Sequence, residues 1–229
     1  MITPDQYLQI VKTRFQEVGH PEVAEGQRKY MRNLFEYYGL KAPEWLAIAK
    51  TLFQEHGVFK GEALTSFVRL CMADEYREIN YFGIEMMQQV LKKQPADFID
   101  FLEELILTKS WWDSVDWLAK LAGIHFLRYP DLIKPVTEKW MNSNNIWLQR
   151  TALIFQLLYK EKTNVPLLFG YIQRLAHSPE FFIQKGAGWA LRQLTRREPE
   201  MVIEFVKTNN LAPLTKREAL KWLQKQGRL

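Results

Sequence analysis

Helical hydrophobic periodicity runs through almost the whole chain and limits what it can fold into. In QYLQIVKTRFQEV, near the N-terminus, apolar residues recur three and four positions apart, which places them on one face of a helix. The segments FIDFLEELIL and NIWLQRTALIFQLLY repeat this pattern. No alternating apolar and polar run flanked by Asn-Gly or Gly-Gly turns occurs, so strands are not predicted. The periodicity predicts an all-α fold.

Residue–proline pairs interrupt this helical pattern at intervals. The residue before a proline disfavours the α conformation, so each pair predicts a helix boundary or a linker. The pairs are His20-Pro21, Ala42-Pro43, Gln94-Pro95, Tyr129-Pro130, Ser178-Pro179, Glu198-Pro199 and Ala212-Pro213.

Five segments also resemble one another, each with polar residues before an apolar turn. Their equivalent positions are Phe82, Ala122, Ala152, Ala187 and Ala219, which are 40, 30, 35 and 32 residues apart. One helical hairpin fits each step, although a HEAT repeat is usually about 40–47 residues long. We predict one α-solenoid domain of HEAT-like hairpin repeats over residues 1–229, whose second helices line a concave groove.

Composition limits the class of protein. The chain is 47% hydrophobic and 25% charged, which is typical of a folded domain. No apolar run reaches the roughly 18 residues of a membrane span, and the N-terminus has no signal-peptide core. The single cysteine, Cys71, lies in the apolar stretch SFVRLCMA and is predicted to be a buried structural thiol. We therefore expect a cytoplasmic protein with no membrane partner.

Charge is distributed unevenly along the sequence. Residues 1–110 hold 13 basic and 16 acidic side chains, a net of −3, whereas residues 111–229 hold 18 and 10, a net of +8. This asymmetry favours a polyanion bound mainly by the C-terminal part, so that the groove is basic. A solvated basic surface without such a partner is the alternative.

The segment SWWDSVDWLAK is the densest candidate site. Trp112 and Asp116 are four residues apart and so share one helix face, whereas Trp111 is off that face and is expected in the core. Packing alone also explains a tryptophan-rich helix start. It explains less well an aspartate one turn inside the helix and aligned with a tryptophan.

Basic residues recur in the next two repeats. Arg150 and Lys185 occupy the same repeat position, and cations stacked along a groove would meet a phosphate backbone. Trp189, one turn after Lys185, is either a second aromatic wall or a core residue. Arg192 is either a further phosphate contact or part of a solvated face.

Motifs for other chemistry are absent from the sequence. The four histidines show no paired metal spacing, and neither a Walker A sequence nor GxGxxG occurs. No nucleophile elbow or Cys/His pair is present. We expect neither a metal nor an organic cofactor.

The same residues resemble the AlkD-type DNA alkylation repair family, bacterial DNA glycosylases built from HEAT-like repeats. The resemblance covers essentially the whole chain and rests on SWWDSVDWLAKLAG, NNIWLQRTALIFQL and FFIQKGAGWALRQL. It implies that Asp116 is the catalytic aspartate, with Trp112 and Trp189 as the cleft tryptophans. It also implies a phosphate contact by Arg150 and, on the weaker match QRKYMRNLF, a place near the DNA for Tyr30.

The resemblance further implies hydrolysis of the N-glycosidic bond of cationic alkylated purines, 3-methyladenine and 7-methylguanine, in duplex DNA. A positively charged base leaves without a general acid, so Asp116 would stabilise the oxocarbenium-like sugar and orient water. The lesion would stay stacked while the protein grips the backbone. We expect a monofunctional glycosylase that acts as a monomer and associates with the nucleoid through DNA.

A non-catalytic helical-repeat adaptor that binds nucleic acid or protein is the second hypothesis. Such an adaptor needs no aspartate between tryptophans, so Trp112, Asp116 and Trp189 are the residues that distinguish the two.

Overall fold

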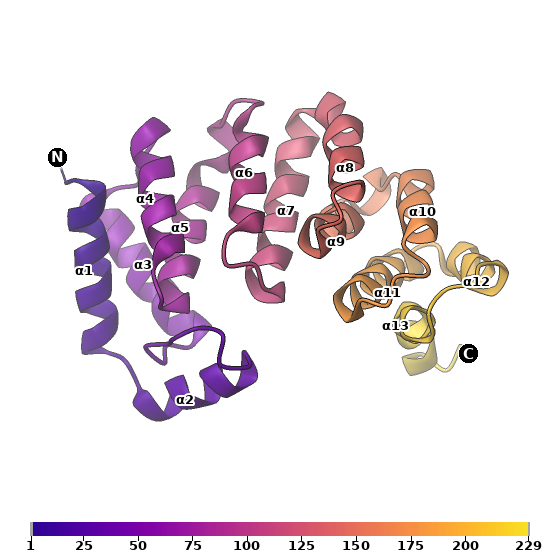
Figure 1. Cartoon of the computed structure of the whole chain (residues 1–229), viewed down its shortest axis with the longest axis horizontal. Helices are drawn as coiled ribbons and strands as arrows, with labels where there is room; N and C mark the ends of the chain where they lie inside the picture. The colour runs from indigo at the N-terminus through magenta and orange to yellow at the C-terminus, as the bar shows by residue number, and fades with distance from the viewer. Residues whose placement is uncertain (1, 229) are drawn as a thin grey trace. The chain divides into compact units, whose positions relative to one another are not determined.

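The computed structural model describes residues 2–228 and confirms an all-α fold (Figure 1). These residues form thirteen α-helices and no strand. Glu36 and Tyr76 form an isolated parallel β-bridge between two short extended segments. Short 3₁₀ segments add to the helices at Leu91–Lys93, Pro130–Leu132, Phe155–Leu158 and Lys160–Lys162. Across residues 2–228, every helix is too short or too polar to cross a membrane.

The chain divides into two compact units, Met1–Pro95 and Ala96–Leu229. The N-terminal unit contains α1 (Pro4–Glu17), α2 (Pro21–Tyr30), α3 (Ala42–His56), α4 (Gly61–Ala73) and α5 (Arg77–Val90). The C-terminal unit contains α6 (Phe98–Leu107), α7 (Trp112–Arg128), α8 (Ile133–Met141), α9 (Ile146–Ile154), α10 (Val165–Arg174), α11 (Phe181–Thr195), α12 (Pro199–Thr208) and α13 (Pro213–Lys225). Along the chain, the boundary between the two units directly follows the predicted Gln94-Pro95 break. A single domain over residues 1–229 stays a prediction.

The residue–proline pairs lie at helix boundaries or between helices, as predicted. Helices α2, α12 and α13 begin at the proline itself, and α3 begins one residue before Pro43. Proline is tolerated in the first turn because the N–H it lacks would have no partner within the helix. Pro130 follows the end of α7, and Pro179 lies in the connection before α11.

In the C-terminal unit, the second helices of successive hairpins pack against one another. Helix α7 contacts α9, α9 contacts α11, and α11 contacts α13. The predicted equivalent positions on these helices, Ala122, Ala152, Ala187 and Ala219, are all buried. Their small side chains permit neighbouring helices to pack closely. The succession of contacts between these helices confirms the hairpin repeat within this unit. The concave shape of the groove stays a prediction.

An aromatic core fills the N-terminal unit. The ring of Tyr7 on α1 lies 5.3 Å from that of Phe67 on α4 and 6.0 Å from that of Phe82 on α5, between centroids. Cys71 is fully buried in the same unit, and burial raises the pKa of its thiol well above the ordinary value. The prediction of a structural rather than a nucleophilic thiol is in keeping with this environment.

Candidate functional site

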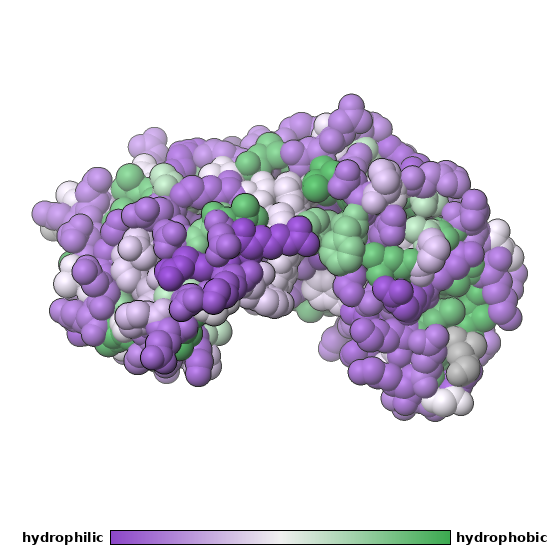
Figure 2. Space-filling model, turned by 60° about the horizontal axis from the view of Figure 1, so that its bottom comes forward, coloured by the Kyte–Doolittle hydropathy of each residue, from purple (hydrophilic) through white to green (hydrophobic). Residues whose placement is uncertain are grey.

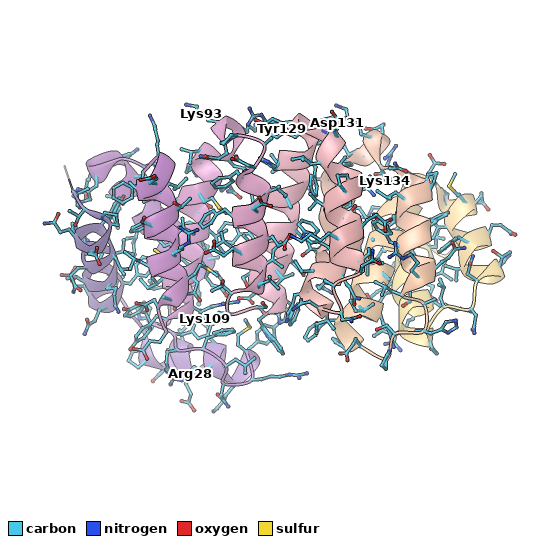
Figure 3. The ribbon with its side chains drawn as sticks, turned by 45° about the horizontal axis from the view of Figure 1, so that its top comes forward. Arg28, Lys93, Lys109, Tyr129, Asp131 and Lys134 are labelled. Atoms are coloured by element: carbon cyan, nitrogen blue, oxygen red, sulfur yellow. The ribbon has the colours of Figure 1, made fainter. Side chains whose placement is uncertain are left out.

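The predicted catalytic residues lie at the N-terminal end of α7. Figure 3 labels Lys109 near this end of the helix and Tyr129 at the opposite end. Trp112 is the first residue of α7, and Asp116 follows it by one turn on the same face. Trp111 precedes the helix in an extended conformation, and its ring packs edge-on against Phe182, 5.0 Å between centroids. Trp111 is thus part of an aromatic cluster, but it is only half-buried and not the core residue that the sequence predicted.

Asp116 and Arg150 form a bidentate ion pair between α7 and α9. The Nε atom of Arg150 donates to Oδ1 of Asp116 at 2.7 Å, and Nη2 donates to Oδ2 at 2.9 Å. Only 4% of the Arg150 side chain and 14% of the Asp116 side chain are exposed. The two parallel bonds fix the plane of the carboxylate, which a single contact would leave free to turn.

A third helix completes the binding of Arg150. Its Nη1 atom donates to the backbone carbonyl of Phe182, the second residue of α11. A Cβ at position 186 would lie 3.0 Å from Nη1, so Gly186 leaves the space that the guanidinium occupies. Arg150 therefore joins α7, α9 and α11 at one point.

An aromatic cluster lies beside this ion pair. The rings of Trp111, Trp147 and Phe182 are mutually 4.9–5.7 Å apart between centroids. The guanidinium carbon of Arg150 lies 6.0 Å from the centroid of Phe182, which is within the range of a cation–π contact. Rigid rings next to the arginine limit its conformations and so hold Asp116 as well.

Trp189 is half-buried on α11 and contacts a lysine of α7. The Nζ atom of Lys120 lies 5.6 Å from the centroid of the Trp189 ring. Lys120 follows Asp116 by four residues, so both lie on one face of α7. The face of α7 that carries Trp112 and Asp116 thus extends to Trp189. Trp189 is therefore more than a core residue, because its ring also makes a cation–π contact with Lys120.

Lys185 and Arg192 do not stand as separate cations. Both bind the carboxylate of Glu218 on α13: Lys185 Nζ donates to Oε1 at 2.8 Å, and Arg192 Nη1 donates to Oε2. The basic positions of α11 were predicted from the sequence, whereas their shared acidic partner was not. Lys120 was also missed, although its spacing from Asp116 is visible in WDSVDWLAK.

Burial and hydrogen bonding oppose each other at Glu218. Burial raises the pKa of this carboxyl, but the hydrogen bonds from Lys185 and Arg192 and the positive charges of Lys185 and Lys221 together leave the pKa below the ordinary value. The carboxylate is therefore ionised at neutral pH. It offsets one positive charge of a cluster that also includes Lys221, whose Nζ atom is 3.8 Å away.

Tyr30 belongs to the N-terminal unit. It is the last residue of α2 and is 73% exposed. Arg32 and Asn33, two and three residues further on, both have left-handed backbone conformations with φ of 58° and 57°, which turn the chain sharply after the helix. A contact between Tyr30 and DNA stays a prediction.

On the face that Figure 2 shows, the C-terminal unit carries hydrophobic residues between the hydrophilic ones. Phe181, the first residue of α11, is one of the exposed apolar side chains.

Among residues 2–228, no three His, Cys, Asp or Glu side chains are grouped so that they could hold a metal ion.

Comparison with known proteins gives a consistent result. A sequence model described as DNA alkylation repair enzyme matches residues 11–223. A structure described as a predicted DNA alkylation repair enzyme from Enterococcus faecalis is 33% identical, covers 90% of this chain and 97% of its own, and superposes with a TM-score of 0.83. AlkD2 from Streptococcus mutans, at 16% identity, has the same fold with a TM-score of 0.65, covering 97% of this chain and 98% of its own. No curated protein matches the sequence.

Proposed function

The chain belongs to the DNA alkylation repair enzyme family, and from that premise we propose that it is a monofunctional DNA glycosylase. Its substrates are the cationic purines 3-methyladenine and 7-methylguanine in duplex DNA, and the reaction is hydrolysis of the N-glycosidic bond. The observation that carries the proposal is the Asp116 carboxylate, fixed by Arg150 on the helix face that also bears Trp112. We further propose a cytoplasmic monomer that works without a cofactor.

The charge of the lesion explains why so few groups suffice. An alkylated purine that already carries a positive charge leaves as a neutral base, so no acid needs to protonate it. Positive charge then develops on the deoxyribose as the bond breaks. Catalysis consists mainly of stabilising that charge with a group already in place.

Asp116 supplies this negative charge. An ionised carboxylate has about four lone-pair sites, and Arg150 occupies one on each oxygen. The remaining sites are free to face the sugar cation or to accept a proton from the attacking water. Arg150 also makes it possible to keep a carboxylate at this low exposure, because an unpaired one would be strongly destabilising.

Trp112 and Trp189 supply electron-rich ring faces. The ring of Trp189 has a cation close to it in the free protein, since Lys120 Nζ lies 5.6 Å from its centroid. The same quadrupole attraction would act on an oxocarbenium-like sugar. In this proposal the lysine moves aside or turns toward a phosphate when the lesion enters.

Arg150 has a larger role than the phosphate contact predicted for it. Three of its five N–H groups are used by Asp116 and the Phe182 carbonyl, which makes it a positioning residue for the catalytic carboxylate. Two N–H groups remain, so a phosphate contact stays a prediction. Lys185 and Arg192, which are more exposed, are better placed to bind the backbone.

The deciding experiment is base release from methylated duplex DNA. We expect the wild-type protein to release 3-methyladenine and 7-methylguanine, and Asp116→Asn to lower the single-turnover rate by about 100-fold or more, as loss of a charge-stabilising group does elsewhere. Asp113→Asn is the matched control, because it makes the same change in the first turn of the same helix and should keep the activity. No release by the wild type would refute the enzyme, and equal release by Asp116→Asn would refute only the role of that residue.

A non-catalytic adaptor is the second candidate, and one observation favours it. A bidentate ion pair with both partners largely buried is also how helices are held together. An adaptor would bind undamaged DNA or a protein and release no base. Substitution of Asp116 would then lower stability and leave no activity to lose.

A further inference from the structure

Glu218 is a largely buried carboxylate at the centre of a basic cluster. Its side chain is 5% exposed, and it comes from α13, whereas its partners Lys185 and Arg192 come from α11. Each oxygen accepts one of these two cations, and Lys221 lies 3.8 Å away on α13 itself. One acidic side chain thus contacts three basic ones.

Close packing of α13 on α11 fixes the position of this carboxylate. A Cβ at position 188 would lie 2.5 Å from Cβ of Glu218 and 2.9 Å from the carbonyl oxygen of Thr215, so glycine is needed for the two helices to approach this closely. The hydroxyl of Thr215 donates to the backbone carbonyl of Gln184 at 3.1 Å. Glu218 therefore arises from a rigid contact and not from a mobile loop.

Both cations keep donors that Glu218 does not use. A lysine has three N–H donors and an arginine five, and each hydrogen bond to Glu218 occupies one of them. The two side chains remain 39% and 25% exposed. They are seven residues apart, about two helical turns, and so lie on one face of α11.

We propose that Glu218 is a positioning residue for the DNA backbone, which holds Lys185 and Arg192 in the orientation that binds phosphate. The inference rests on the proposed function, because it takes duplex DNA as the ligand. A preset pair of cations loses less conformational entropy on binding than two free side chains do. The negative charge that Glu218 adds is outnumbered by the three cations around it.

The test is binding of undamaged duplex DNA by the full chain over a series of salt concentrations. Glu218→Gln keeps the size of the side chain and removes its charge. We expect this variant to bind DNA about tenfold more weakly at high salt. Salt screens the long-range attraction between protein and DNA, so that directly oriented contacts matter most there. Glu138→Gln is the matched control, because it makes the same change of charge elsewhere in the unit. Glu138 on α8 also forms an ion pair between helices, with Arg174 on α10 at 2.7 Å. The control should bind as the wild type does.

A triple variant separates positioning from stability. In a Lys185→Gln, Arg192→Gln background, Glu218→Gln should cause no further loss of affinity, since no cations are left to orient. A further tenfold loss in that background would mean that Glu218 acts through the fold, and would overturn the inference. Unchanged or tighter binding by Glu218→Gln alone would overturn it too, while DNA binding lost by the Lys185 and Arg192 variants would still support the proposed function.

Discussion

Arg150 holds Asp116 through the geometry of its guanidinium, and a substitution that keeps only the charge tests this. Lysine cannot form two parallel bonds to a carboxylate and also reach the Phe182 carbonyl. We expect Arg150→Lys to lower the single-turnover rate of 7-methylguanine release by about 10–100-fold, because a small displacement of a catalytic group has effects of that size. The dissociation constant for DNA should change by less than about threefold, since the positive charge remains.

The two measured quantities distinguish the two roles of Arg150. A normal rate with weakened DNA binding would mean that the arginine acts on a phosphate and that its ion pair with Asp116 is incidental. Arg174→Lys is a suitable control, because Arg174 forms an ion pair with Glu138 in the same unit and both side chains are partly exposed. It should leave both quantities unchanged.

At the scale of the helices, sequence information was sufficient for boundaries and repeats but not for pairings. Proline pairs and periodicity act within a few residues, so the starts of α2, α3, α12 and α13 could be predicted from them. The ion pair between Asp116 and Arg150 joins residues 34 apart, and that between Arg192 and Glu218 joins residues 26 apart. Spacing within one helix cannot reveal such contacts, because they depend on how neighbouring hairpins are rotated.

Two helical glycines, one in the contact between α11 and α13 and one outside it, are expected to respond oppositely to alanine. A Cβ at Gly188 would overlap Glu218 and Thr215, so we expect Gly188→Ala to lower the free energy of unfolding by about 1–3 kcal/mol. Gly170 lies in α10, where a Cβ would meet open space, so Gly170→Ala should raise it by about 0.5–1 kcal/mol through helix propensity. Urea denaturation measures both. Equal effects of the two substitutions would show that α13 does not pack closely on α11.

For the whole molecule, the division into units refines the distribution of charge. Residues 1–95 hold 12 basic and 12 acidic side chains, and residues 96–229 hold 19 and 14, so the entire net charge of +5 belongs to the C-terminal unit. Dividing the sequence at residue 110 instead counts the acidic side chains of α6, such as Glu103, with the N-terminal half. The unit that carries Asp116 is thus also the one whose charge attracts a polyanion.

The rate of base release should depend on whether the lesion carries a positive charge. The proposed mechanism provides an anion and two indoles but no acid to protonate a leaving base, and general acids contribute about 10²–10⁴-fold to such reactions. We expect the wild-type protein to release 7-methylguanine while releasing a neutral lesion, hypoxanthine, at least about 100-fold more slowly from a duplex of the same sequence. Binding to the two duplexes should be similar, because the backbone contacts are shared. Comparable release of both bases would require a proton donor in the site, and Lys120, beside Trp189 and one turn from Asp116, would be the first residue to replace.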